Sequence, residues 1–257
     1  MVLFLFPNIS YDITMELIPK IIYENKEILV LDKPSGLVVH ANGRNSEPTL
    51  TDWLLQNYPE IQGVGEPLFI RKGKEEISFD RSGIVHRLDR DTSGAMAVAK
   101  TKEAYVFLKE QFETRKVQKT YLAFVWGNIK EDKGFVDAPI GKSRNDFRQW
   151  QAGDNARGTM RDAHTDFSVI KRVEENGEHF CLCEIQPKTG RTHQIRVHMK
   201  YIHHPVVGDH LYASSRPMAF GFDRLALHAW KLKIIMLSGE EKEFEAKMPE
   251  MFEKLVK

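Results

Sequence analysis

The sequence HRLDRDTSG, at residues 86–94, leads directly into the small, apolar segment GAMAVAKT at 94–101. The apolar segment is typical of a buried strand, and the Thr-Ser-Gly run at 92–94 would form a turn that presents Asp89. An arginine stands close to Asp89 on each side. Adjacent side chains on a strand or a sharp turn point away from one another, so a distant arginine is a better ion-pair partner for Asp89 than these neighbours.

A second segment, GRTHQIRVHMKYI at 190–202, has helical spacing. Positions i, i+4 and i+7 form an apolar stripe that would pack on the core: Ile195, Met199 and Ile202. Thr192, which follows Gly190 closely, is the expected N-cap. Arg196 falls at the edge of the stripe, so the helix would hold this side chain partly buried.

Asp89 and Arg196 each need a partner of opposite charge. A partly buried arginine without a carboxylate costs several kcal/mol, and a close positive charge keeps a carboxylate in its ionised form. We therefore expect the two side chains to pair, although they lie far apart in the sequence. An ionised, oriented aspartate can serve as a nucleophile or as a base.

The remaining segments alternate between strand and helix patterns. In the first half, apolar bursts predict paired strands over 21–33, and a helix is predicted over 50–58 with Thr49 as its N-cap. Residues 60–83, rich in glycine and charge, are expected to form a long exposed loop. A helix is predicted over 102–116, after the buried strand.

In the second half, TYLAFVWG at 120–127 predicts a strand, and the segments 164–173 and 178–187 predict a hairpin closed by an Asn-Gly turn. Two further elements are predicted at the end of the chain: a helix-to-strand unit over 224–237 and a closing helix over 248–257.

The composition indicates an ordinary globular chain of one domain or two tightly joined halves. With 257 residues and 42% hydrophobic content it can bury a sizeable core, and its net charge of +1 excludes an overall cationic field. A nucleic-acid site must then be a local basic patch. The polar segment 141–161 is expected to be a loop that supplies such a patch, or is plain solvated surface: Lys142, Arg144, Arg148, Arg157 and Arg161.

Two features bear on the compartment. The apolar opening at residues 1–13 is too short to cross a bilayer and lacks a basic leader, so we expect an edge strand or a frayed end there. Cys181 and Cys183 alternate on a predicted strand, so they face the same way, cannot form a disulfide bond and stay reduced. These features predict a cytoplasmic protein without membrane contact.

Motifs in a fixed order resemble those of the RluA-type pseudouridine synthases. They are LDKPSGLVVH at 31–40, HRLDRDTSG at 86–94, KTYLAFVWG at 119–127 and GRTHQIRVH at 190–198. The later segments HHPVVGDHLY at 203–212 and RLALHA at 224–229 are similar to the family's C-terminal motifs. The match runs from about Ile21 to the C-terminus.

The resemblance implies an α+β fold, the pseudouridine synthase fold, in which helices and loops flank a central mixed, largely antiparallel sheet with an active-site cleft in the middle. Residues 21–257 would form the catalytic domain and residues 1–20 an N-terminal extension. Many members carry an S4-like RNA-binding domain ahead of the catalytic part. Because the LDKPSG motif arrives by residue 33, we expect no such domain here. Ala213 stands where the family usually has glycine, which concerns a turn rather than the chemistry.

The resemblance also implies the reaction, which is the isomerisation of specific uridines to pseudouridine in structured ribosomal or transfer RNA. Asp89 would attack the target uridine, so that the glycosidic bond breaks and re-forms through C5, with attack at C1′ and attack on the base both open. Tyr121 would stack on the flipped base and is a candidate for proton transfer, while Arg196 would pair with Asp89. No metal or organic cofactor is implied.

Recognition of the RNA requires more groups than these. A uridine inside folded RNA hides its reactive atoms, so the base must turn out into a pocket at a cost of a few kcal/mol. Arg87 would fill the vacated position, because a planar guanidinium stacks on bases and bonds phosphates, and Arg90 would contact phosphate or protein. Further RNA contacts are expected from Lys142, Arg144, Arg148 and His193. We expect a monomer whose RNA binding falls steeply with salt.

Other functions fit parts of the sequence. A catalytically silent RNA-binding or RNA-folding module would be marked by loss of the aspartate or the tyrosine, and neither is lost. Hydrolysis of a nucleoside bond would need a second carboxylate and a water beside Asp89, and no partner acid is evident. A phosphate cradle at 33–36 would need more than one glycine, so a structural turn near the active site is expected there. The histidines that might suggest a metal lack the spacing of a zinc pair and a third ligand: His193, His198, His203 and His204.

Overall fold

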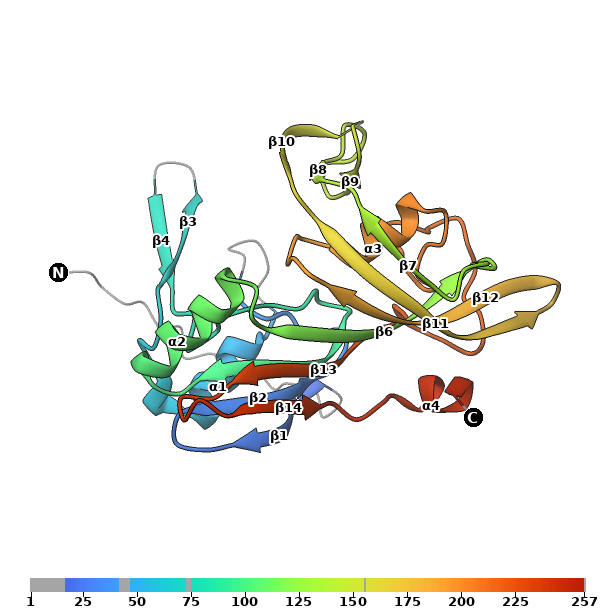
Figure 1. Cartoon of the computed structure of the whole chain (residues 1–257). Coiled ribbons are helices and arrows are strands. Elements are labelled where there is room, and N and C mark those ends of the chain that lie inside the picture. Colours follow the sequence, from blue (N-terminus) through green and yellow to red (C-terminus); the bar gives the residue numbers. More distant parts are fainter. Residues whose placement is uncertain (1–16, 42–46, 73–74, 155, 257) are drawn as a thin grey trace.

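One nine-stranded sheet runs through the molecule (Figure 1). The structure, a computed structural model, describes residues 17–41, 47–72, 75–154 and 156–256. In spatial order the strands are β1 (Lys20–Glu24), β2 (Ile28–Lys33), β5 (Ser93–Ala99), β13 (Leu227–Ile235), β6 (Gln118–Trp126), β12 (Glu178–Pro187), β11 (His164–Glu175) and β7 (Lys133–Asp137), and β14 (Glu241–Glu245) also pairs with β13. Strands β5 and β13 are parallel and the other described pairs are antiparallel, so the predicted mixed, largely antiparallel sheet is confirmed.

Two hydrophobic clusters pack on this single sheet. One is built on β2 and β5 with α1 (Leu50–Asn57) and α2 (Lys102–Glu113). The other is built on β6 and β12 with α3 (Gln194–Tyr201) and α4 (Glu250–Val256). Tyr121, near the start of β6, packs against both clusters and so marks the junction of the two halves. The two clusters therefore share one sheet.

Local signals in the sequence explain several of these elements. Helix α1 begins after Thr49, whose hydroxyl accepts from the Asp52 amide while the Asp52 carboxylate accepts from the Thr49 amide, a reciprocal cap. The hairpin β11–β12 turns at Asn176 and Gly177, which both have positive φ, as a two-residue hairpin turn requires. These predictions are confirmed. Cys181 and Cys183 lie buried and unpaired on β12, also as predicted.

Three predictions of irregular or helical structure are wrong. Part of the expected loop 60–83 forms a 3-10 turn (Pro59–Ile61) and a hairpin, β3 (Leu68–Lys72) with β4 (Glu75–Phe79). The polar segment 141–161 forms a small sheet of β8 (Ile140–Lys142), β9 (Trp150–Ala152) and β10 (Arg157–Arg161). Both pieces project from the upper edge of the view in Figure 1. These strands belong to small sheets separate from the main one. Their sequences therefore lack the regular hydrophobic alternation by which a core strand is recognised.

The third wrong prediction is the helix of the helix-to-strand unit over 224–237. The backbone of Ala226 donates to Val207 and accepts from Phe124, so this segment is held extended before β13 begins. The predicted closing helix is present as α4. The predicted edge strand or frayed end at residues 1–13 lies outside the described residues. Within the described residues, every helix is too short or too polar to cross a bilayer.

Candidate active site

A pocket of about 630 Å³ lies between the two halves of the chain. Its walls come from the loop 81–92, the end of α2, the start of β6 and the segment 187–196 that leads into α3. This volume falls in the range of pockets that enclose a small molecule, roughly 300–1,000 Å³. Five of the predicted catalytic and RNA-binding residues line it: Arg87, Asp89, Tyr121, His193 and Arg196.

The predicted contact between Asp89 and Arg196 is present. Arg196 Nη1 lies 3.1 Å from Asp89 Oδ2 and donates a hydrogen bond to it. The guanidinium is almost fully buried, whereas the Asp89 carboxylate retains a modest exposure toward the pocket. The second carboxylate oxygen, Oδ1, makes no bond to Arg196 and is the better placed of the two to meet a ligand.

Sequence reasoning missed the residue that holds Arg196. Asp209 is fully buried, and its two oxygens accept from Arg196 Nε at 2.7 Å and Nη2 at 2.8 Å. The backbone amides of Leu211 and Tyr212 donate to the same carboxylate. Burial opposes the charge of Arg196, but its bonds to Asp209 and Asp89 outweigh this and raise the pKa of the guanidinium. Asp209 lies in the HHPVVGDHLY motif, and only the need of a buried arginine for a second carboxylate could have indicated its role.

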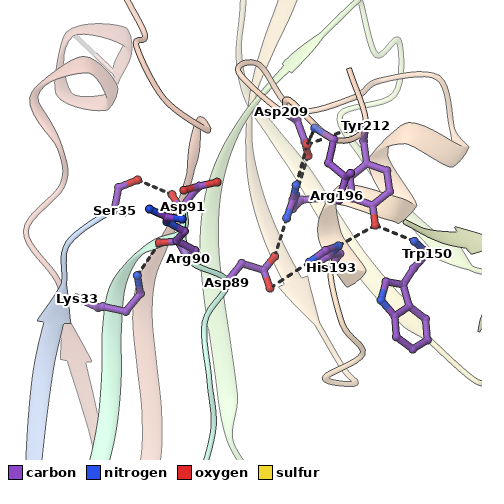
Figure 2. Close-up of polar contacts among 11 residues, drawn as sticks. Lys33, Ser35, Asp89, Arg90, Asp91, Trp150, His193, Arg196, Asp209 and Tyr212 are labelled. Atoms are coloured by element: carbon purple, nitrogen blue, oxygen red, sulfur yellow. Dashed lines mark hydrogen bonds and ion pairs between the residues drawn. The ribbon is translucent and has the colours of Figure 1, made fainter. Parts of the chain in front are cut away.

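Two more side chains join this cluster, as Figure 2 shows. His193 Nε2 lies 3.9 Å from Asp89 Oδ1, and His193 Nδ1 lies 2.8 Å from the hydroxyl of Tyr212. The same hydroxyl accepts from the backbone amide of Trp150 on β9, and the Tyr212 ring stacks against the Arg196 guanidinium. A chain of contacts therefore joins β9 to Asp89 through Tyr212 and His193.

The groups that contact the His193 ring indicate which of its two nitrogens carries the hydrogen. Burial lowers the pKa of His193, despite the opposing charge of Asp89, so the ring is neutral at pH 7. Tyr212 already accepts from Trp150, so its own proton can go to Nδ1 of His193. This arrangement puts the ring hydrogen on Nε2, which lies 3.9 Å from Asp89 Oδ1, so that the carboxylate meets an attractive N–H and not a lone pair.

His193 also corrects the predicted start of the helix. It is the N-cap of α3, with a left-handed backbone at φ 55°, in place of Thr192. The preceding turn is closed by the Gln194 side chain, whose amide oxygen accepts from the Arg191 amide and the Thr189 hydroxyl. A threonine cap is therefore not used, and the unusual backbone at His193 turns its ring toward the pocket. The predicted apolar stripe packs on the core as expected.

Tyr121 provides an apolar face to the pocket. Its side chain is half-buried on β6. Burial and, after it, the charge of Asp89 raise the pKa of the Tyr121 phenol. At physiological pH the group is therefore a neutral hydroxyl that can donate a hydrogen bond, and not a phenolate base.

A buried lysine fastens the loop that carries Asp89. Lys33 Nζ donates to the carbonyls of Pro34 and Leu37 at 2.8 Å. It also donates to the carbonyl of Arg90 at 2.9 Å, as Figure 2 shows. Burial, against the charges of nearby aspartates, lowers the pKa of Lys33 to about 7. The segment 33–36 is thus the structural turn that the sequence predicted. The turn predicted at 92–94 lies instead at 90–91, and Ser93 and Gly94 begin β5. A Cβ on Gly94 would lie 2.2 Å from the Ala229 carbonyl, so glycine is required at this position of the strand.

The remaining predicted residues fall in two places. Arg87 is exposed at the pocket, and its Nη1 lies 3.2 Å from His40 Nε2. Arg90 is turned away from the pocket and pairs with Glu47 at 2.9 Å. The basic patch of Lys142, Arg144 and Arg148 lies outside the pocket, around β8 and the turn to β9. Within it, Lys142 lies over the Trp150 ring at 4.0 Å and Arg148 pairs with Asp146 at 2.7 Å. The backbone amide of Trp150 also donates to the Tyr212 hydroxyl. Trp150 therefore contacts both the basic patch and the cluster around Asp89.

Comparisons with known proteins agree with this picture. The family model described as RNA pseudouridylate synthase matches residues 27–201. An uncharacterized RNA pseudouridine synthase of Synechocystis is 38% identical over 96% of this chain and 71% of its own length. The ribosomal large subunit pseudouridine synthase D of Yersinia pestis is 38% identical over 92% of this chain and 69% of its own length. Among solved structures, human RNA pseudouridylate synthase domain containing 1 matches with a TM-score of 0.70 and 27% identity, over 96% of this chain and 89% of that one.

Proposed function

Because the chain belongs to the RNA pseudouridylate synthase family, and is therefore an isomerase that acts on RNA, we propose that its reaction takes place at Asp89. The observation that carries this assignment is the arrangement around Arg196. Asp209 holds the guanidinium from one side, and the remaining nitrogen holds one oxygen of Asp89. The other oxygen of Asp89 faces the pocket, where a uridine can reach it.

In the proposed reaction Asp89 is the nucleophile, either at C1′ of the ribose or on the base. If Asp89 attacks C1′, the bond from N1 to C1′ breaks as the bond to Asp89 forms, the base turns, and the bond to Asp89 breaks as C5 bonds to C1′. If Asp89 adds to the base, the bond from N1 to C1′ breaks, the base turns, C5 bonds to C1′, and Asp89 then leaves the base. C5 then loses its proton and N1 gains one, so the product is an isomer of the substrate. Tyr121 supplies an aromatic face for the extruded base, worth about 1–3 kcal/mol by general stacking estimates. As a neutral phenol it can also donate to a base oxygen.

The groups at the mouth of the pocket are proposed to handle the RNA. Arg87 would occupy the position that the flipped base leaves, because its guanidinium is exposed at the pocket two residues from the nucleophile. His193 lies inside the pocket, where it is better placed to orient Asp89 than to bind a phosphate. The basic patch is proposed to bind the RNA backbone. Arg90, bound to Gly36 and Glu47, is proposed to brace the Asp89 loop.

We propose structured ribosomal RNA of the large subunit as the substrate class. Several relatives at 34–38% identity are named ribosomal large subunit pseudouridine synthase D. Residues 21–257 are proposed to act as one catalytic domain, as a monomer in the cytoplasm. The RNA substrate and the two unpaired cysteines are consistent with this location.

Hydrolysis of the nucleoside bond is not favoured by the geometry. The structure does provide a second carboxylate near Asp89, that of Asp209. Both of its oxygens are occupied by Arg196, it is fully buried, and it is not part of the pocket wall. It cannot activate a water in the pocket as a hydrolase would require.

The experiment incubates the protein with transcripts of large-subunit ribosomal RNA and with a pool of transfer RNA, and maps carbodiimide-reactive uridines. New sites in the ribosomal transcript that are absent with Asp89→Asn are expected. A matched control is Asp91→Asn, which removes a nearby carboxylate whose backbone, and not its side chain, is bonded to Ser35. Equal activity of Asp89→Asn would contradict the role of Asp89. New sites in transfer RNA alone would contradict the substrate class, and release of free uracil would indicate hydrolysis.

A further inference from the structure

The pocket extends beyond the residues assigned to the reaction. In addition to the cluster around Asp89 it is lined by Arg81, by Arg115 just after α2, and by Lys119 on β6. These three residues are here called the cationic side of the pocket. The proposed reaction uses none of them.

Lys119 and Tyr121 have a fixed relation to one another. They lie two residues apart on β6, so their side chains leave the same face of the sheet about 7 Å apart along the strand. Tyr121 is the proposed platform for the base. The phosphate group next to a nucleotide stacked on Tyr121 would therefore lie close to the Lys119 ammonium.

The three charges on the cationic side have no carboxylate partner among the described residues. Lys119 is half-buried, and its ammonium donates only to the Thr189 carbonyl at 3.1 Å among the described residues, with no carboxylate in ion-pair contact. Arg81 has a buried Nε without a hydrogen-bond partner in the described part of the chain. A buried donor without an acceptor costs about 1–3 kcal/mol, so such groups point to a missing ligand.

One other cation of the same pocket contrasts with these three, because Lys188 is paired with the Asp166 carboxylate at 3.0 Å. Arg191, like Lys119, donates to a backbone carbonyl, that of Asp162, and so adds to the positive charge of the pocket. Glu113, a carboxylate of the pocket wall apart from Asp89, lies 3.8 Å from Lys109. The cationic side thus carries a local excess of positive charge that the protein itself does not compensate.

We propose that the cationic side of the pocket, with Lys119 at its centre, binds a phosphodiester group of the RNA strand that flanks the nucleotide on Tyr121. This inference rests on the proposed function, since it places the flipped nucleotide at Tyr121 and Asp89. A phosphodiester supplies the two anionic oxygens that the unpartnered donors lack, and a lysine binds it as a point charge.

The binding should depend on pH. Burial and, after it, the charge of Arg115 lower the pKa of Lys119 to about 8. A bound phosphodiester favours the ammonium form, so affinity should be full below pH 8 and fall as the pH rises above it. The charged and titratable groups that line the pocket together with Lys119 are Arg81, His86, Arg87, Asp89, Glu113, Arg115, Tyr121, Lys188, Arg191, His193 and Arg196.

The test compares Lys119→Met with Lys119→Arg and measures the Kd for a substrate RNA and the single-turnover rate of the bound complex. For Lys119→Met, the Kd should rise about 10- to 100-fold, with the rate in the complex little changed. The slope of log Kd against log salt should become shallower by about 0.7, the value for one contact on a single strand. Lys119→Arg should keep the affinity and lose the decline above pH 8, because arginine stays charged.

Two RNAs with a neutral methylphosphonate on the 5′ or the 3′ side of the target uridine complete a double-mutant cycle. One of them should weaken binding by the parent protein and have no further effect on Lys119→Met. The control Lys116→Met removes an exposed lysine outside the pocket, which pairs with Glu110.

Three results would overturn the proposal. They are additive effects in both cycles, an unchanged Kd, or a loss of thermal stability in Lys119→Met that accounts for the weaker binding through the Thr189 contact. If the parent protein forms no pseudouridine in the unmodified RNA, the proposed function fails instead, so the two failures are distinguishable.

Discussion

Arg196 is bound at two points to Asp209 and at one point to Asp89. Its Nε and Nη2 lie 2.7 and 2.8 Å from the Asp209 oxygens, and its Nη1 lies 3.1 Å from Asp89. The shorter, two-point pair fixes the plane of the guanidinium, because a planar fork matches a carboxylate in only a few orientations. Asp209, which does not line the pocket, therefore fixes the orientation of Arg196 and, through Arg196, that of Asp89.

Replacing Asp209 should cost both stability and activity. Asp209→Asn removes one of the three carboxylate oxygens that accept from the buried guanidinium, together with the negative charge of Asp209, and removal of one member of a buried ion pair typically costs about 3–5 kcal/mol. We expect a loss of this size in urea unfolding, with a lower rate of pseudouridine formation at saturating RNA. The double variant Asp209→Asn with Arg196→Met should lose less than the sum of the single variants. Strict additivity would show that the two side chains do not act as a pair.

Tyr212→Phe removes the hydroxyl between the Trp150 amide and His193. His193 then loses the partner that keeps its hydrogen on Nε2, and Asp89 loses an oriented neighbour. We expect the rate of the bound complex to fall while the Kd for RNA stays nearly the same, since the ring and its stacking on Arg196 remain. The readout is a single-turnover pH profile, which should shift in Tyr212→Phe. An unchanged profile and rate would leave Tyr212 with a packing role only.

Arg87→Ala should harm some substrates more than others. If Arg87 fills the place of the flipped base, its loss matters most where the base leaves a stacked helix and least where the uridine is already unstacked. We expect a large loss of kcat/KM on a stem-loop RNA and a small loss on a single-stranded oligonucleotide that contains the same target. Equal losses on both would assign Arg87 to bracing the loop through His40.

The basic patch should contribute to affinity and not to the chemical step. Lys142→Ala combined with Arg144→Ala should weaken RNA binding and make its salt dependence shallower by about two contacts. Arg148 is already paired with Asp146, so Arg148→Ala should have a smaller effect. Lys254→Ala on α4, whose side chain pairs with Glu250, is the matched control. A salt slope that is unchanged in the double variant would identify the patch as solvated surface.

His228 makes stability depend on pH. Burial lowers the pKa of His228 to about 3, well below the value of about 6.5 in the unfolded chain. The unfolded state therefore binds a proton between pH 6.5 and 3 that the folded state does not. The stabilisation is present above pH 6.5 and is lost as the pH falls, at up to about 1.4 kcal/mol per pH unit. Urea unfolding of His228→Gln at several pH values should show a shallower decline in this window, and an identical decline would contradict the prediction.

Much of this protein could be predicted because its signals are local in the chain. The cap at Thr49, the Asn-Gly turn and the alternating cysteines each depend on neighbours a few residues away. The contact between Asp89 and Arg196 was predictable for a different reason. A buried charge requires a partner of opposite charge, which favours a contact between Asp89 and Arg196. The two motifs that contain these residues also resemble motifs of one and the same family.

The tertiary structure alone decided what surrounds that pair. Asp209 and Tyr212 reach the site because the segment after α3 folds back on it, and Tyr212 is joined to β9 through a backbone amide, which has no sequence signal. The polar segment around β8 and β9 appears irregular in sequence because its strands pair in a small separate sheet, without a continuous apolar face. The sequence motifs thus indicate which residues take part in the reaction. Their orientation comes from contacts between distant segments, since a buried charge takes its geometry from whichever partners the fold brings to it.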